Sequence, residues 1–287
     1  MTLQTKSSRS TPNYIEAETE YIAVDGVSYA YRSAGERSDV PLICLQHFTG
    51  TLDNWDPQVI DGLARNRQVI TIDNSGIGNS GGSTPDNVQD MAQTVVRIIT
   101  GLGICKCDLL GFSLGGFIAQ TVAISNPELF RKIILVGTAP QGTGALHSFP
   151  QLVARAFAME PAEGYLYLFA TSSEKSREKI RSAQSRFLQR KIDRDKPIAM
   201  PAIQAQITAL TRWGTDPVTI DLGAIPHPVL IIQGSNDEMM NSASSLELFR
   251  HIPDAILTFY PDSSHGSFFQ YPESFVDQAN SFLEKFI

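Results

Sequence analysis

The feature that most constrains this chain is an apolar run that ends in Gly-x-Ser-x-Gly and passes directly into a helical pattern. Residues 107–112 are mostly apolar, the motif is Gly111-Phe112-Ser113-Leu114-Gly115, and residues 114–126 continue as a helix. A strand, a tight turn and a helix in this order form a nucleophile elbow, in which the glycines leave room for the turn and the serine hydroxyl points out of the sheet. The pattern predicts that Ser113 is a nucleophile.

A second match to the motif, around Ser80, has a different context. The sequence Gly78-Asn79-Ser80-Gly81-Gly82 follows no predicted strand directly, and Pro85 stands where a helix would begin. We therefore interpret this match as a loop, and Ser113 remains the candidate nucleophile.

Short apolar runs alternate with helical patterns along most of the chain. The runs near residues 70, 134 and 230 are continuous rather than alternating, which is typical of parallel strands that helices cover on both faces. The first two strands alternate and are joined at Asp25-Gly26, a hairpin signal. The predicted fold class is α/β, a doubly wound, mostly parallel sheet with an antiparallel edge. Strands are predicted at 21–24, 27–32, 41–46, 68–73, 107–112, 132–137, 229–234 and 255–260, and helices at 57–65, 88–101, 114–126, 243–250 and 272–286.

The strand pattern stops between residues 138 and 225. Helices are predicted there at 149–159, 162–169, 174–191 and 202–213. Ligands of open α/β folds bind at the carboxyl edge of the sheet, so these helices are expected to cover that edge as a cap. The predicted organisation is a core over residues 1–139, with 1–16 as a flexible tail, a helical cap over 140–224 and a second part of the core over 225–287.

Composition excludes several classes of partner. The net charge of −7 and the pI near 5.3 argue against nucleic acid or an anionic membrane surface. No apolar stretch is long enough to span a bilayer, and the first residues lack the apolar region of a secretory signal, which leaves a transit peptide as the alternative to a tail. Cys44, Cys105 and Cys107 lack metal or redox spacing. We therefore expect a cytoplasmic protein that needs no metal.

Two loops after predicted strands carry the partners that a serine nucleophile needs, a base and an acid that orients it. His265 follows the last strand in a loop of small residues. Asp237 comes directly after the turn that ends strand 229–234, whereas Glu238 is expected to point to solvent. The chain order is Ser113, Asp237, His265, which is the order of one known serine–histidine–acid arrangement.

With these loops in place, the chain resembles the α/β-hydrolases that have a helical cap, over about residues 18–287. It is similar to the subgroup that contains cofactor-free haloperoxidases, carboxylesterases and carbon–carbon bond hydrolases. The resemblance implies a triad of Ser113, His265 and Asp237 and no cofactor. It is carried by Leu45-Gln46-His47-Phe48 with Trp55 downstream, by Asp73-Asn74-Ser75-Gly76-Ile77-Gly78-Asn79-Ser80, by the Ser113 elbow, and by the Asp237 and His265 loops.

The resemblance also implies an oxyanion hole made of two backbone N–H groups. One belongs to Leu114, the residue after the nucleophile, and the other to a residue just after the third strand. The family usually has His-Gly there, whereas this chain has His47-Phe48. Alignment on His47 and alignment on Trp55 both give Phe48 as the second donor.

A serine nucleophile narrows the chemistry to attack on a carbonyl, because dehalogenases and epoxide hydrolases need a carboxylate at that position. The predicted activity is that of a carboxylic-ester hydrolase on a small, largely apolar ester or lactone. Perhydrolysis, as in the haloperoxidases, and cleavage of a carbon–carbon bond in a diketone use the same triad and stay open. From another class, a ligand-binding receptor of the same fold also stays open.

Aromatic side chains of the predicted cap are candidates for the substrate pocket. Phe157, Phe169 and Trp213 are predicted to line it together with His47 of the core. The expected partner is therefore a small molecule, and a homodimer is left open.

Overall fold

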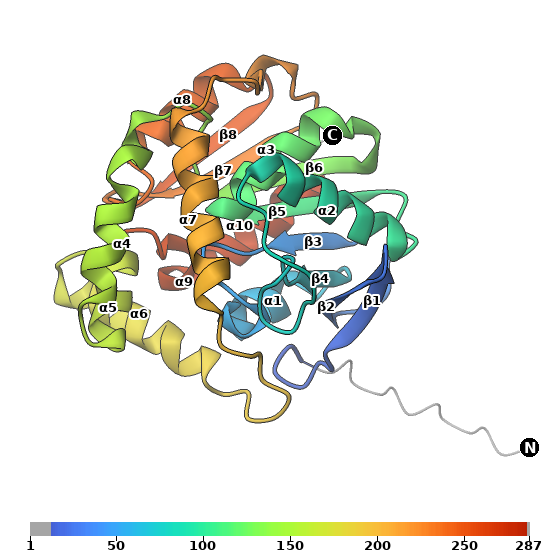
Figure 1. Ribbon diagram of the computed structural model, residues 1–287, viewed down its shortest axis with the longest axis horizontal. Coiled ribbons are helices and arrows are strands. Elements are labelled where there is room, and N and C mark those ends of the chain that lie inside the picture. Colours follow the sequence, from blue (N-terminus) through green and yellow to red (C-terminus); the bar gives the residue numbers. More distant parts are fainter. Residues whose placement is uncertain (1–12, 286–287) are drawn as a thin grey trace, which may run out of the picture.

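The eight strands of the computed structural model, which describes residues 13–285, form one sheet in the order β1-β2-β4-β3-β5-β6-β7-β8 (Figure 1). Strand β2 pairs antiparallel with β1 and β4, and the other neighbours pair parallel. The bounds are β1 Glu20–Val24, β2 Val27–Ala34, β3 Leu42–Leu45, β4 Val69–Ile72, β5 Cys107–Phe112, β6 Phe130–Val136, β7 Val229–Gly234 and β8 Ala255–Tyr260. The predicted mostly parallel sheet with an antiparallel edge is confirmed.

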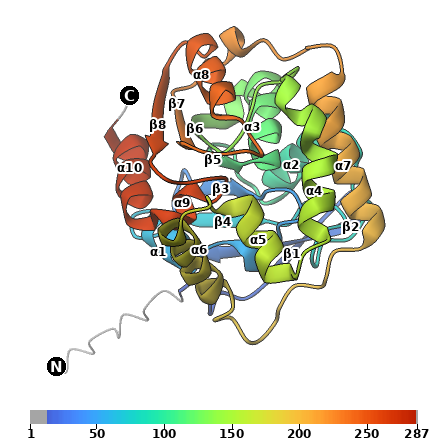
Figure 2. The ribbon, with the colours of Figure 1, turned by 90° about the vertical axis from the view of Figure 1, so that its left-hand side faces the viewer.

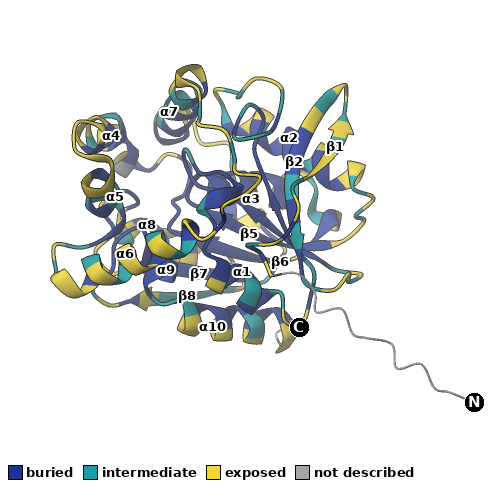
Figure 3. Cartoon of the chain, turned by 90° about the horizontal axis from the view of Figure 1, so that it is seen from below, coloured by how far each residue is buried: buried dark blue, intermediate teal, exposed yellow. Residues whose placement is uncertain are grey.

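Helices cover both faces of this sheet, as the continuous apolar strands require. Every residue of β3, β4, β5 and β7 is buried. Figure 3 shows α2 and α3 on one side of the sheet and α1 and α10 on the other. The helix bounds in the core are α1 Pro57–Leu63, α2 Val88–Gly101, α3 Leu114–Ser125, α8 Ser242–His251, α9 Ser267–Gln270 and α10 Pro272–Lys285, with short 3₁₀ helices at Leu52–Asn54 and Pro127–Leu129. Two further 3₁₀ helices, Gly144–Ser148 and Leu222–Ala224, lie between β6 and β7.

Four α-helices are inserted between β6 and β7 and lie along one edge of the sheet (Figures 1 and 2). They are α4 Phe149–Phe157, α5 Pro161–Phe169, α6 Glu174–Phe187 and α7 Met200–Thr215. Residues from α4 and α5 line a cavity together with Ser113, which follows β5. The inserted helices therefore stand over the carboxyl edge. In the described part of the chain, no helix is long and apolar enough to cross a membrane.

The connection from α6 to α7 is attached to the core by buried charges. Arg32, on β2, donates to the Asp53 carboxylate at 2.8 Å and to the Asp195 carboxylate at 3.2 Å. The Asp195 carboxylate also accepts the Asp53 backbone N–H at 2.7 Å. Because unpaired buried charges are costly, this group of opposite charges constrains the connection strongly.

Part of the predicted flexible tail over residues 1–16 packs on the core. Residues 1–12 lie outside the described residues, but Tyr14 is buried. Its hydroxyl donates to the Leu52 carbonyl at 2.7 Å and lies 2.9 Å from the Thr71 hydroxyl. A buried tyrosine with a bonded hydroxyl is a packed residue, so the tail prediction was wrong at Tyr14.

Candidate active site

Ser113 lies in a strained turn between β5 and α3. Its φ of 55° is in the left-handed region, which a residue with a side chain adopts only when its surroundings impose it. A Cβ at Gly111 would collide with the Gly115 backbone, and a Cβ at Gly115 would collide with the Leu45 carbonyl. The two glycines thus allow α3 to begin directly against the sheet, which is the geometry of a nucleophile elbow.

The loops after β7 and β8 bring Asp237 and His265 together. His265 Nδ1 lies 2.9 Å from Asp237 Oδ2, and neither side chain is exposed. The other carboxylate oxygen accepts the backbone N–H groups of Met239 and Met240, each at 2.9 Å. Because the carboxylate can only accept, Nδ1 carries the proton and Nε2 is left to accept one. Glu238, the neighbouring acid, is exposed.

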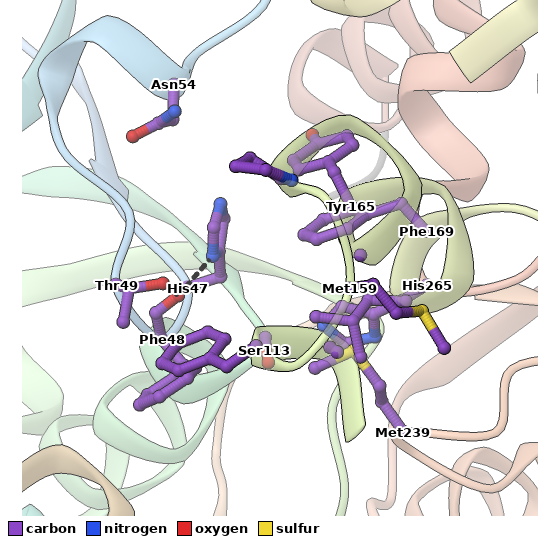
Figure 4. A pocket seen from close by; sticks show the side chains of 15 residues that line it. His47, Phe48, Thr49, Asn54, Ser113, Met159, Tyr165, Phe169, Met239 and His265 are labelled. Atoms are coloured by element: carbon purple, nitrogen blue, oxygen red, sulfur yellow. Dashed lines mark hydrogen bonds between the residues drawn. The ribbon is translucent and has the colours of Figure 1, made fainter. Parts of the chain in front are cut away.

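Ser113 and His265 line the same cavity of about 420 Å³, but they form no hydrogen bond with one another (Figure 4). Ser113 Oγ and His265 Nε2 are both buried, and neither has a hydrogen-bond partner among the described residues. Buried polar atoms without partners are rare in folded proteins. Catalytic serine–histidine contacts are often long before a substrate binds, so the arrangement is suited to nucleophilic catalysis.

The loop that carries Phe48 is held in one orientation by hydrogen bonds. The Phe48 carbonyl accepts from His47 Nδ1 at 2.6 Å and from the Thr49 hydroxyl at 2.7 Å. Thr49 has a φ of 58°, a strained value for a β-branched residue. Its N–H donates at 2.8 Å to Oε1 of Gln206, a fully buried residue of α7. An inserted helix thus fixes the peptide that follows Phe48.

Two backbone donors are available near Ser113. The N–H groups of Phe48 and Leu114 donate to no other residue in the described part of the chain. Leu114 begins α3, whose N-terminus carries positive dipole. This arrangement could stabilise negative charge on an oxygen next to Ser113.

The walls of the cavity are mainly apolar. Phe157 and Phe169, two of the predicted pocket residues, line it, and so does His47. The other apolar lining residues are Phe48, Ala156, Met159, Pro161, Gly164, Leu168 and Met239, and the other polar ones are Thr49, Asn54 and Tyr165.

Comparison with known proteins identifies the family. Residues 40–272 match the family model described as the alpha/beta hydrolase fold. The chain belongs to the α/β-hydrolase family. A solved alpha/beta hydrolase fold protein from Chitinophaga pinensis is 52% identical to it, with a TM-score of 0.95, over 96% of this chain and 100% of that one.

Two curated relatives are hydrolases of known type. A pimeloyl-(acyl-carrier protein) methyl ester esterase from Nitrosomonas europaea is 25% identical over 77% of this chain and 87% of its own length. A 2-hydroxy-6-oxo-6-phenylhexa-2,4-dienoate hydrolase from Comamonas testosteroni is 29% identical over 76% of this chain and 77% of its own length. These relatives support hydrolytic activity for this α/β-hydrolase.

Trp213 does not line the cavity of this α/β-hydrolase, contrary to the prediction. It is 2% exposed and stacks on Phe117 of α3, with ring centroids 4.9 Å apart. Its indole N–H donates to the Ala139 carbonyl at 3.2 Å. A large aromatic residue on an inserted helix serves equally well to pack that helix on the core, and Trp213 does so between α7 and α3.

Sequence reasoning missed Thr49, Asn54, Met239 and Gln206. Met239 lies two residues after Asp237, and Thr49 lies one residue after Phe48, so closeness to a predicted site residue was a usable signal for both. No such signal marks Gln206, a glutamine on a helix far along the chain. Its role depends on how α7 meets the loop after β3.

Proposed function

We propose that this α/β-hydrolase cleaves a small, largely apolar carboxylic ester or lactone through an acyl-enzyme. The observation that carries the proposal is the buried His265–Asp237 pair together with the strained Ser113, because His265 and Ser113 line one cavity with mainly apolar walls. The esterase among the curated relatives supports the same class of substrate.

The proposed mechanism uses Ser113, His265, Asp237 and two backbone N–H groups. Ser113 Oγ attacks the substrate carbonyl carbon while His265 Nε2 takes its proton, and Asp237 stabilises the imidazolium through Nδ1–H. The carbonyl oxygen, now negative, accepts hydrogen bonds from the N–H groups of Phe48 and Leu114. His265 then protonates the leaving alkoxide, and a water molecule resolves the acyl-enzyme by the same steps.

The inserted helices would act as a cap over residues 140–224, between core segments 1–139 and 225–287. Ser113 is fully buried, and α4 and α5 supply one wall of its cavity. A covered site of about 420 Å³ is suited to compact acyl groups, since small-molecule pockets enclose most of their ligand. Long-chain lipid is therefore expected to be a poor substrate.

A panel of substrates tests the proposal against its alternatives. The relative from Comamonas testosteroni favours carbon–carbon bond hydrolysis as a second candidate. Hydrolysis of 4-nitrophenyl esters or lactones, with labelling of Ser113 by a fluorophosphonate, is the expected result. Turnover of a vinylogous diketone alone would favour the second candidate, peracid formation alone would favour perhydrolysis, and binding without turnover would favour a receptor.

Gln206→Leu is expected to lower kcat about 10- to 100-fold with little change in KM. The leucine removes the acceptor of the Thr49 N–H, so the peptide between Phe48 and Thr49 loses its fixed orientation. The adjoining Phe48 N–H is then less well oriented to stabilise the oxyanion. The measurement is steady-state kinetics with a 4-nitrophenyl ester. Gln204→Leu, an exposed position on the same helix, is the matched control. Equal kcat values for the two variants would contradict the assigned role of Gln206.

Trp213→Ala and Phe157→Ala are expected to affect different properties. Trp213 is buried, so its truncation should lower the free energy of unfolding by about 3–5 kcal/mol. Phe157 is 55% exposed and lines the cavity, so its truncation should cost less than about 1 kcal/mol and change the ranking of ester substrates. Urea denaturation and kcat/KM over an acyl series measure the two effects. A larger stability loss in Phe157→Ala would refute this division.

A further inference from the structure

The His47 ring presents a hydrogen-bond acceptor that none of residues 13–285 uses. Its Nδ1 lies 2.6 Å from the Phe48 carbonyl, which can only accept, so Nδ1 carries the proton. In the neutral ring Nε2 is then an acceptor. This atom is buried and has no partner among the described residues, although the side chain lines the cavity. A buried acceptor of this kind gains most from a donor that the ligand brings.

His47 is suited to recognition rather than to proton transfer. Burial lowers the pKa of His47 to about 3, and the hydrogen bond to the Phe48 carbonyl offsets only part of that effect. At neutral pH the His47 ring is therefore uncharged and is a weak base. Its Nε2 would bind a donor and keep the same protonation state throughout the reaction.

His47 also lies close to the reacting groups. Its ring centroid is 5.1 Å from that of Phe112, and the His265 centroid is 5.0 Å from the same ring. Phe169 likewise lies 5.3 Å from His47 and 5.6 Å from His265. Both histidines therefore border the same two aromatic rings, and both line the cavity that Ser113 also lines.

Asn54 adds a donor to the same wall. Its Oδ1 accepts the Thr51 backbone N–H at 2.9 Å and lies 3.2 Å from the Thr51 hydroxyl, which fixes the orientation of the amide. Its Nδ2 donates to no residue in the described part of the chain, and Asn54 lines the cavity. Figure 4 shows His47 and Asn54 on the side of the cavity opposite Phe169 and Met159.

We propose that His47 and Asn54 form a polar subsite that binds a hydroxyl or a secondary amide one or two carbons from the scissile carbonyl. The substrate hydroxyl or N–H donates to His47 Nε2, and an oxygen of the same group accepts from Asn54 Nδ2. The favoured substrates are thus hydroxy or acylamino esters and lactones whose remaining parts are apolar. The proposal rests on the proposed ester or lactone hydrolysis and names the substrate class of that same site.

Three 4-nitrophenyl esters test the subsite on the unmodified protein. The acyl groups are 3-hydroxybutanoyl, 3-methylbutanoyl, in which a methyl replaces the hydroxyl, and 3-methoxybutanoyl, which keeps the oxygen but loses the donor. After correction for spontaneous hydrolysis, kcat/KM for the hydroxy ester is expected to exceed that for the methyl ester about 10- to 100-fold. The methoxy ester should lose most of this advantage because it has no donor for His47.

Variants of His47 and Asn54 test whether these two residues cause the preference for the hydroxy ester over the methyl ester. In His47→Asn the new amide N–H can still donate to the Phe48 carbonyl while Nε2 is lost, and His47→Phe keeps an aromatic ring without either nitrogen. Asn54→Asp keeps an acceptor for Thr51 and loses the Nδ2 donor. Each should bring the hydroxy-to-methyl ratio of kcat/KM close to one, whereas His251→Phe, at an exposed histidine bonded to the Glu247 carbonyl, should leave it unchanged.

The outcomes separate the subsite from the proposed function. Equal kcat/KM values for the hydroxy and methyl esters in the unmodified protein, with normal turnover, would overturn the subsite alone. A strong preference that survives in correctly folded His47 variants would do the same, with fluorophosphonate labelling of Ser113 as the check on folding. If a variant fails to fold, the kcat/KM values of the three esters on the unmodified protein still test the subsite. No turnover of any ester and no labelling would overturn the proposed function instead.

Discussion

Replacing Ser113 with alanine is expected to lower kcat for ester hydrolysis by about a million-fold, because the nucleophile and its base act as one unit. The fold should be unaffected, since Ser113 Oγ has no hydrogen-bond partner among the described residues and its removal leaves no other group unpaired. Steady-state kinetics and thermal unfolding measure the two effects. Fluorophosphonate labelling should disappear with the activity.

Ser80→Ala is the matched control, because Ser80 stands in the second Gly-x-Ser-x-Gly sequence. Its hydroxyl accepts the Ala30 N–H and donates to the Asp73 carbonyl, each at 2.9 Å. Both bonds are structural, so this variant should lose about 1–3 kcal/mol of stability and keep its labelling. Labelling of Ser80, or persistent labelling of Ser113→Ala, would show that the nucleophile is another residue.

The sheet could be predicted because its strands are short continuous apolar runs that turn signals separate. The differences are at the ends, where local sequence is least informative. Strand β6 begins at Phe130 rather than at residue 132, because Phe130 pairs with Cys107 across a register shift. Helix α6 ends at Phe187 although helical spacing continues to residue 191.

The candidate triad could be located from sequence because topology alone brings its loops together. Strands β5, β7 and β8 run parallel, so the residues after them meet at one edge whatever their side-chain packing. No comparable rule of topology predicts, from the sequence, which core residues the inserted helices contact. Trp213 packs on α3, and Gln206 reaches the Thr49 N–H, because of how α7 rests on the core. Such contacts depend on tertiary packing between segments distant in the chain.

Asp237→Asn is expected to lower kcat about ten-thousand-fold, because the amide no longer fixes the productive tautomer of His265. The Asp237 carboxylate faces donors on both oxygens: Oδ1 accepts the N–H groups of Met239 and Met240, and Oδ2 accepts from Gln233 Nε2 at 3.2 Å and lies 2.9 Å from His265 Nδ1. The two backbone N–H groups can only donate, whereas the imidazole can change its tautomer, so an asparagine is expected to turn its oxygen to the backbone donors and its NH₂ to His265. Nδ1 must then accept, the proton moves to Nε2, and Nε2 cannot take the proton of Ser113.

Glu238→Gln is the control for this prediction, since Glu238 is the adjacent acid and is exposed. Its kcat should stay within about two-fold of the unmodified value, as for most surface substitutions. Thermal unfolding of both variants shows whether a loss of activity is a loss of fold. Because the Asp237 variant keeps Ser113 and both backbone donors of the proposed oxyanion hole, it should retain slow turnover above that of water alone. A large loss in Glu238→Gln with activity kept in Asp237→Asn would assign the orienting acid to Glu238 instead.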